Sequence, residues 1–155
     1  MESIGFIGGG NMAQALIKGI IKAKVYQPGN IFVSDIKPER LAYLSKEYGI
    51  QIVGDNKALA GKVDTLVLSV KPQTMADVLG EIKDAVRTKT LIISIAAGKR
   101  TAAIAGVLGD AAMVRVMPNT PALIGEGASA LFANEKGKSM LDKAVSKNFF
   151  SFVIS

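Results

Sequence analysis

Short apolar runs alternate with longer amphipathic stretches along this chain. The runs TLVLSV and TLIISI, which begin at Thr65 and Thr90, lack the in–out alternation of a half-exposed strand. Elsewhere, polar residues recur at helical spacing, as in Gln14, Lys18 and Lys22. Strands that are apolar on both faces and are separated by helices indicate a parallel sheet covered on both sides. The pattern predicts a doubly wound, mostly parallel α/β fold with right-handed crossovers and helices on both faces.

The element boundaries follow from the same alternation. Strands are predicted at 4–7, 31–34, 51–53, 65–70, 91–95, 113–117 and 128–132. Helices are predicted at 12–23, 38–48, 56–60, 75–86, 101–108 and 138–149. The chain has 155 residues, a length that suits one hydrophobic core, so we expect a single domain.

Three consecutive glycines occupy the first strand-to-helix turn. Residues 8–13 read Gly-Gly-Gly-Asn-Met-Ala and match the pattern G-x-G-x-x-A. Gly8 would permit a tight turn, Gly10 would leave room for a pyrophosphate, and Ala13 would let the helix lie close to the sheet. The helix from Met12 would direct free N–H groups at the phosphates. A turn that merely reverses the chain is the alternative, but the position at the head of a βαβ unit favours dinucleotide binding.

The second predicted strand ends in Ser34-Asp35, where the adenosine ribose of a dinucleotide would lie. An acid at this place ordinarily accepts from the ribose hydroxyls of NAD and repels the extra phosphate of NADP. However, Ser34, Lys37 and Arg40 surround the acid with a hydroxyl and two cations, which favour a phosphate. Alternatively, both cations are solvated charges at a helix start. These residues therefore leave the choice between NADPH and NADH open.

Composition excludes several kinds of chemistry. The sequence contains no cysteine and no histidine, which removes disulfides, thiolate and imidazole catalysis and the usual zinc sites, so we expect no metal. The net charge is +6, but the basic residues are scattered among few aromatics, so we expect no nucleic-acid binding. The uncharged stretch 3–17 is interrupted by glycines and is shorter than the roughly 20 residues that a span needs. No membrane association and a cytoplasmic location are the expectations.

Three further stretches carry a family resemblance: SVKPQ at 69–73, SIAAG at 94–98 and RVMPNTPALIGEGASAL at 115–131. Together with GFIGGGNMA at 5–13, in this order, they resemble the N-terminal domain of pyrroline-5-carboxylate reductase. The resemblance implies a Rossmann-like NAD(P)-binding domain. It also implies an oxidoreductase that reduces 1-pyrroline-5-carboxylate to L-proline in proline biosynthesis, with NADPH as the expected cofactor and NADH possible.

The resemblance also implies where the cofactor lies. The pyrophosphate would rest in the first turn, the adenosine after the second strand and near Asn56, and the ribose and nicotinamide beside the loops after the fourth and fifth strands. Ligands of parallel sheets bind beyond the carboxyl ends of strands, which agrees with these places. With the candidates argued from the residues themselves, the expected cofactor contacts are Phe6, Ile7, Gly8, Gly9, Gly10, Asn11, Met12, Ser34, Asp35, Lys37, Asn56, Ser69, Val70, Lys71, Pro72, Ile95, Ala96, Ala97 and Asn119.

No catalytic residue is assigned from the sequence. Two prolines flank Asn119 and Thr120 and stiffen the backbone, so these side chains suit the holding of a nicotinamide or a small imine. Lys71, kept extended by Pro72, is a third candidate for positioning. Hydride transfer to the carbon of a C=N bond depends mainly on placing the two partners, and no general acid is named.

Members of the resembled family continue into an all-helical domain that forms the homo-oligomer and part of the substrate pocket. The present sequence ends at Ser155, after NFFSFVIS, where that domain would begin. We therefore expect residues 1–155 to be a dinucleotide-binding domain that is truncated before the dimerisation domain. Two alternatives remain: a nucleotide-binding or regulatory module without turnover, and another Rossmann-type imine or hydroxyacid reductase.

Overall fold

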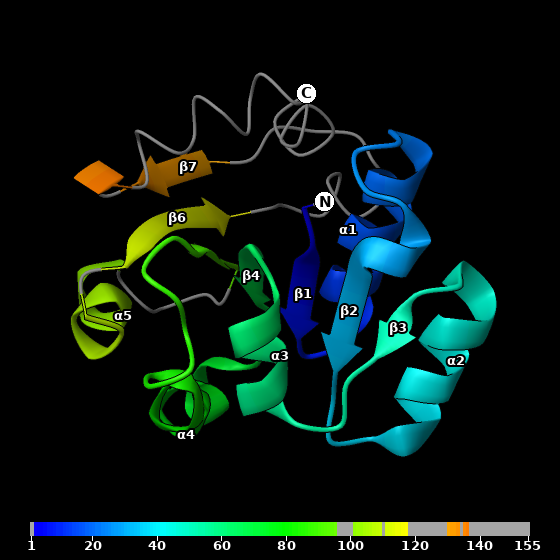
Figure 1. The fold of residues 1–155 in the computed structure, drawn as a ribbon, viewed down its shortest axis with the longest axis horizontal. Coiled ribbons are helices and arrows are strands. Elements are labelled where there is room, and N and C mark those ends of the chain that lie inside the picture. Colours follow the sequence, from blue (N-terminus) through cyan, green and yellow to red (C-terminus); the bar gives the residue numbers. More distant parts are fainter. Residues whose placement is uncertain (1, 96–100, 110, 118–129, 134, 137–155) are drawn as a thin grey trace.

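A seven-stranded sheet forms the centre of the computed structural model, which describes residues 2–95, 101–109, 111–117, 130–133 and 135–136 (Figure 1). The strands are β1 (Ile4–Ile7), β2 (Ile31–Ser34), β3 (Gln51–Ile52), β4 (Thr65–Leu68), β5 (Leu91–Ser94), β6 (Ala112–Met117) and β7 (Ala130–Ala133). Their spatial order is β3-β2-β1-β4-β5-β6-β7. All neighbouring pairs are parallel except β6 and β7, which are antiparallel. The predicted α/β class is confirmed.

Helices cover both faces of this sheet. They are α1 (Asn11–Lys22), α2 (Pro38–Tyr48), α3 (Asn56–Lys62), α4 (Pro72–Ile82) and α5 (Thr101–Val107), and a 3₁₀ turn spans Pro28–Asn30. Buried residues of α1 and α2 pack on one face, and those of α3, α4 and α5 pack on the other. No helix in the described part of the chain is both long and apolar enough to span a bilayer.

The unbroken apolar strands supply both layers of the core. On β1, Phe6 faces the layer of α1 and α2, whereas Ile7 faces the layer of α3 and α4, and both are almost completely buried. Val67 and Leu68 divide in the same way on β4. Burial of each such side chain contributes about 1.5–3 kcal/mol. Continuous apolar sequence is therefore the local cause of the two-sided sheet.

Several boundaries differ from the predicted ones by a few residues. Helix α4 begins at Pro72 rather than at 75 and ends at Ile82 rather than at 86. Proline suits the first turn of a helix, because it needs no N–H partner there and its φ is already helical. β4 accordingly ends at Leu68 rather than at 70, which leaves Ser69 and Val70 in the connecting loop. The helix predicted at 138–149 lies outside the described residues.

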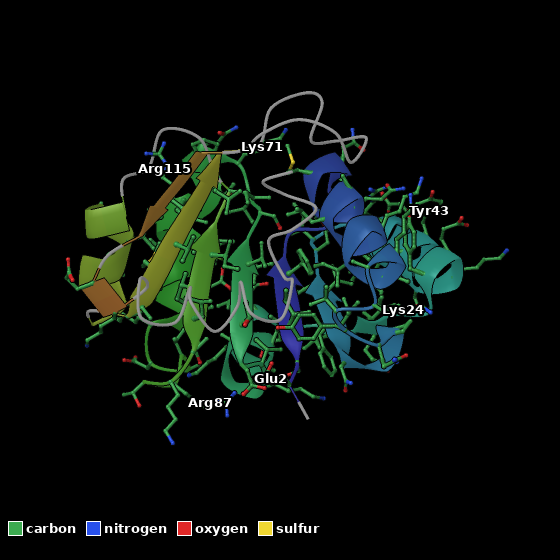
Figure 2. The ribbon with its side chains drawn as sticks, turned by 90° about the horizontal axis from the view of Figure 1, so that it is seen from above. Glu2, Lys24, Tyr43, Lys71, Arg87 and Arg115 are labelled. Atoms are coloured by element: carbon green, nitrogen blue, oxygen red, sulfur yellow. The ribbon has the colours of Figure 1, made fainter. Side chains whose placement is uncertain are left out.

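The carboxyl ends of the central strands meet at one edge of the sheet. Ile7 at the end of β1 pairs with Ser34 on one side and with Leu68 on the other, and Leu68 pairs in turn with Ser94. Figure 2 shows Lys71 and Arg115 at this edge and Glu2 and Arg87 at the opposite one. The strand order reverses between β1 and β4. In open α/β sheets this carboxyl edge at the reversal point is where ligands bind.

Candidate functional site

Gly8 follows β1 and joins it to the ends of two other strands. Its N–H donates to the carbonyl of Ser34 at 2.9 Å, and its φ is +101°. A Cβ at this position would lie 2.7 Å from the backbone oxygen of Ser69. Any other residue would therefore be strained by its backbone angle and would collide with main chain. The tight turn predicted at Gly8 is present.

Gly9 is the glycine that the sequence motif leaves unspecified. Its N–H donates to Oδ2 of Asp35 at 2.7 Å. A Cβ would lie 2.9 Å from Cδ1 of Leu44, a buried residue of α2. The absence of a side chain at Gly9 therefore lets the turn lie directly against α2 and the loop that precedes it.

Among the residues that the structure describes, none occupies the space beside Gly10. No heavy atom within the described part of the chain lies within 4 Å of the Cβ that a larger residue would add. Gly10 caps α1 without a side-chain hydrogen bond, and the first turn of that helix holds no acidic residue. By contrast, Asp55 caps α3 by accepting from the N–H groups of Lys57 and Ala58. The beginning of α1 therefore presents uncapped N–H groups and a positive helix end to the outside.

This combination fits a phosphate-bearing ligand. Helix N-termini bind anions because several N–H groups point the same way and the helix dipole favours negative charge. The glycines bring bare main chain close to such a ligand, and the open space beside Gly10 leaves room for it. The side chains of Phe6 and Ile7 are buried in the core, so at these two positions only the main chain is available to a ligand.

Ser69 connects the end of β4 to the glycine turn. Its hydroxyl lies 2.9 Å from the carbonyl oxygen of Ile7 and 2.7 Å from that of Gly8, and it shares its single proton between these two acceptors. Its N–H also donates to the Ile7 carbonyl at 3.0 Å. The expected contact residue Ser69 therefore holds the turn in place through its side chain.

Ser34 and Asn56 lie side by side, although 22 residues separate them in the sequence. The Ser34 hydroxyl donates to Oδ1 of Asn56 at 2.6 Å, and Ser34 is only 3% exposed. Nδ2 of Asn56 donates to Oε2 of Glu81 at 3.2 Å. Two residues expected near the adenosine are thus brought together at the carboxyl edge of β2.

Asp35 is occupied by main-chain donors. Oδ2 accepts from Gly9 N–H, and Oδ1 accepts from Lys37 N–H at 2.9 Å. The acid that the sequence suggested as a ribose acceptor therefore also bridges the glycine turn and the beginning of α2. Ile36, which lies between Asp35 and Lys37 in the sequence, is 93% exposed. Lys37 is the N-cap of α2 and is also exposed.

The loops after β4 and β5 complete this edge. Lys71 is the N-cap of α4, and its carbonyl accepts from the N–H and hydroxyl of Thr74. Figure 2 shows Lys71 at the carboxyl edge, and its side chain is exposed. Ile95 is half-buried, and its N–H donates to the carbonyl of Leu68. The remaining expected site residues, Ala96, Ala97, Asn119 and Thr120, lie outside the described residues.

Two features of this edge were missed by reasoning from the sequence. Arg40 donates from Nε to the carbonyl of Gly9 and from Nη2 to Oε1 of Gln14. The sequence suggested only a charge near Asp35, because spacing does not show which acceptor a long side chain reaches. The exposure of Ile36 was also missed. Its position directly after Ser34-Asp35 was the available signal, since a residue that follows the end of a strand lies at the ligand-binding edge.

These features define a Rossmann-type dinucleotide-binding domain: a β1–glycine turn–α1 unit at the reversal point of a parallel sheet, with an uncapped helix start. A comparison with family models matches residues 3–98 to the family described as NADP oxidoreductase, coenzyme F420-dependent. The chain belongs to this family.

Comparisons with individual proteins confirm the resemblance recognised in the motifs. The chain is 39% identical over 153 residues to the pyrroline-5-carboxylate reductase of Methanosarcina acetivorans, covering 98% of this chain and 56% of that protein. The solved structure of pyrroline-5-carboxylate reductase from Coxiella burnetii superposes with a TM-score of 0.88 at 38% identity, covering 99% of this chain and 57% of the other.

A third comparison is with a structure that contains a cofactor. The Plasmodium falciparum pyrroline carboxylate reductase, crystallised with NADP bound, superposes with a TM-score of 0.83 at 31% identity and covers 99% of this chain and 56% of the other. The chain thus spans about half the length of the relatives that it matches.

Proposed function

We propose that this chain is the cofactor-binding part of an enzyme that reduces 1-pyrroline-5-carboxylate to L-proline with NADPH, or with NADH. The observation that carries the proposal is the open space beside Gly10 at the uncapped start of α1, a place suited to a pyrophosphate. The sequence identity to pyrroline-5-carboxylate reductases supports the choice of substrate.

The adenosine half of the cofactor would lie at the carboxyl end of β2. Ser34 and Asn56 offer a hydroxyl and an amide there, and the exposed Lys37 offers a positive charge for a 2′-phosphate. Ile36 provides an exposed apolar surface against which an adenine could rest. Since both oxygens of Asp35 already accept main-chain hydrogen bonds, this acid disfavours a 2′-phosphate less than a free carboxylate would. These features favour NADPH.

The nicotinamide half would lie along the loops that follow β4 and β5. Ser69, Val70, Lys71 and Pro72 would line one side, and Ile95 with Ala96 and Ala97 the other. The cofactor would supply the hydride, which would pass to the carbon of the already protonated C=N bond, whose π electrons would move to the imine nitrogen. The protein's part is to hold both partners in reacting position, for which Lys71, Asn119 and Thr120 are the candidates.

Residues 1–155 would then form the cofactor domain of a longer, homo-oligomeric architecture like that of the resembled family. The helical part of that architecture would contribute to the substrate pocket. No part of this proposal involves a metal, a nucleic acid or a membrane, and a cytoplasmic location remains the expectation from the sequence.

The test is a cofactor titration of this chain, run beside an assay of proline-dependent reduction of NADP⁺ and NAD⁺. We expect saturable binding of NADP⁺, measured by isothermal titration calorimetry. A chain that binds neither cofactor would overturn the proposal. Binding without turnover would favour a nucleotide-binding module over a self-sufficient enzyme, and turnover with hydroxyacids instead of proline would favour another reductase of the same fold.

A further inference from the structure

Side chains from the β2–α2 unit and from the loop after β4 hold the peptide groups on both sides of Gly9. The Gly9 N–H donates to Asp35, 26 residues away, and the Gly9 carbonyl accepts from Nε of Arg40, 31 residues away. On the preceding peptide, the Gly8 carbonyl accepts from the Ser69 hydroxyl at 2.7 Å. Asp35 and Ser69 therefore hold the Gly8–Gly9 peptide, and Arg40 holds the Gly9–Gly10 peptide.

The direction of the Gly10 N–H follows from this arrangement. A trans peptide is planar, so its C=O and N–H bonds point in opposite directions. Arg40 draws the Gly9 carbonyl toward α2, and the Gly10 N–H of the same peptide must then point away from α2. Within the described residues this N–H has no hydrogen-bond acceptor, and the space beside Gly10 is open. Arg40 thus fixes the orientation of a free donor beside the place proposed for the pyrophosphate.

Arg40 is itself held in place by α1 and α2. Its Nη2 donates to Oε1 of Gln14, and its guanidinium carbon lies 5.3 Å from the centre of the Tyr43 ring. Gln14 is oriented in turn, because its Nε2 donates to the hydroxyls of Tyr48 at 3.0 Å and Tyr43 at 3.3 Å. The planar guanidinium is therefore fixed by its hydrogen bonds to two acceptors and by a cation–π contact with the Tyr43 ring.

We propose that Arg40 is a positioning residue for dinucleotide binding, acting through the Gly9 carbonyl on the orientation of the Gly10 N–H rather than by touching the cofactor. The inference rests on the proposed function. It departs from the simplest interpretation of the sequence, in which Arg40 is one of two cations for a 2′-phosphate. The two roles predict different selectivity, because the pyrophosphate is common to NADP⁺ and NAD⁺ whereas the 2′-phosphate is not.

The test compares the dissociation constants of NADP⁺ and NAD⁺ for the whole chain and for Arg40→Ala, by calorimetry. We expect both cofactors to weaken by the same factor, about tenfold, the usual effect of losing one hydrogen bond to a charged group. ADP-ribose, which keeps the pyrophosphate but lacks the nicotinamide, should weaken by that factor too. Arg40→Lys, which can donate to Gly9 but cannot form the planar fork, should recover part of the loss.

Arg87→Ala is the matched control. Arg87 also donates to a main-chain carbonyl and to a side chain, those of Val63 and Asp64, but at the opposite edge of the sheet. This variant should keep the affinity for both cofactors. Far-ultraviolet circular dichroism and thermal unfolding establish that each variant is folded at the titration temperature.

Three outcomes would count against the proposal. A loss confined to NADP⁺ would show that Arg40 meets the 2′-phosphate, and unchanged affinities in a folded variant would show that it is only a surface charge. An equal loss in Arg87→Ala would show that the effect is one of general stability. A parent chain that binds neither nucleotide would instead overturn the proposed function itself.

Discussion

The hydroxyl of Ser34 donates to Oδ1 of Asn56 at 2.6 Å and joins the end of β2 to the beginning of α3. Ser34 is 3% exposed, so Asn56→Ala should leave a buried hydroxyl without its acceptor and lower the free energy of unfolding by about 1–3 kcal/mol. Urea unfolding measures this loss. In a double-mutant cycle with Ser34→Ala, the double variant should lose less than the sum of the single variants. Additive losses would mean that the hydrogen bond contributes nothing.

Lys37→Glu should weaken NADPH far more than NADH. Lys37 is exposed beside Ser34 and Asp35, where the adenosine ribose is proposed to lie. Because the residue is exposed, water screens its charge, and we expect about a tenfold loss for NADPH rather than a larger one. Titration of both cofactors against the variant measures the ratio. Equal losses for the two cofactors would show that Lys37 is only a solvated charge at the start of α2.

Gly10→Val should abolish cofactor binding and leave the fold intact. The backbone at Gly10 has a φ of −76°, which valine adopts without strain, and an added side chain would meet no described atom within 4 Å. The side chain would instead fill the space proposed for the pyrophosphate. Calorimetry measures binding, and thermal unfolding measures the fold. Gly80→Val, in equally open space on α4, is the matched control and should bind as the parent does. Retained affinity in Gly10→Val would refute the proposed position of the pyrophosphate.

Gly8→Ala should destabilise the fold. The residue has a φ of +101°, and the new methyl group would lie 2.7 Å from the carbonyl oxygen of Ser69. The strained backbone alone costs about 1–3 kcal/mol, and the collision with main chain adds to it. Chemical unfolding should therefore show a clear loss that Gly10→Ala does not share. A Gly8→Ala chain as stable as the parent would contradict the described turn.

The stability of the chain at alkaline pH should depend on Tyr26. Burial raises the pKa of Tyr26 above its usual value of 10.0, and the negative charges of Glu2 and Asp64 add to this, while a hydrogen bond with Thr65 opposes it. A folded-state pKa above the unfolded one means that the stabilisation is complete below pH 10 and is lost as the pH rises through the folded-state pKa.

The free energy of unfolding should accordingly fall more steeply above pH 10 in the parent than in Tyr26→Phe, which has no phenol to ionise. Denaturant unfolding at several alkaline pH values measures the two slopes. Tyr43→Phe, at an exposed position of α2, serves as the control and should follow the parent. Parallel curves for parent and Tyr26→Phe would show that ionisation of this phenol does not couple to folding.

Local signals in the sequence predicted most of the fold. Apolar runs such as 65–70 and 91–95 identified strands buried on both faces, and Pro38 and the glycines marked where helices begin and turns occur. Boundaries shifted where two local signals competed, as at Pro72, which starts α4 one turn earlier than the apolar periodicity suggests. The sequence predicted that the candidate site lies in the loops after the parallel strands, because the loops that follow such strands all lie at the same edge of the sheet.

By itself, the sequence determined the succession of strands and helices along the chain and the glycine turn at the first helix, since these depend on neighbours within a few residues. The parallel sheet could be inferred from that succession, because parallel strands need a crossover between them. The tertiary structure alone decided that Asp35 and Arg40 bind the Gly9 peptide, and that Ser34 meets Asn56. These partners are 22 to 31 residues apart in the sequence. Asp35 and Arg40 reach Gly9 because β1 pairs with β2, and Ser34 meets Asn56 because α3 packs against β1 and β2. Which atoms a long side chain reaches is set by that packing rather than by spacing along the chain.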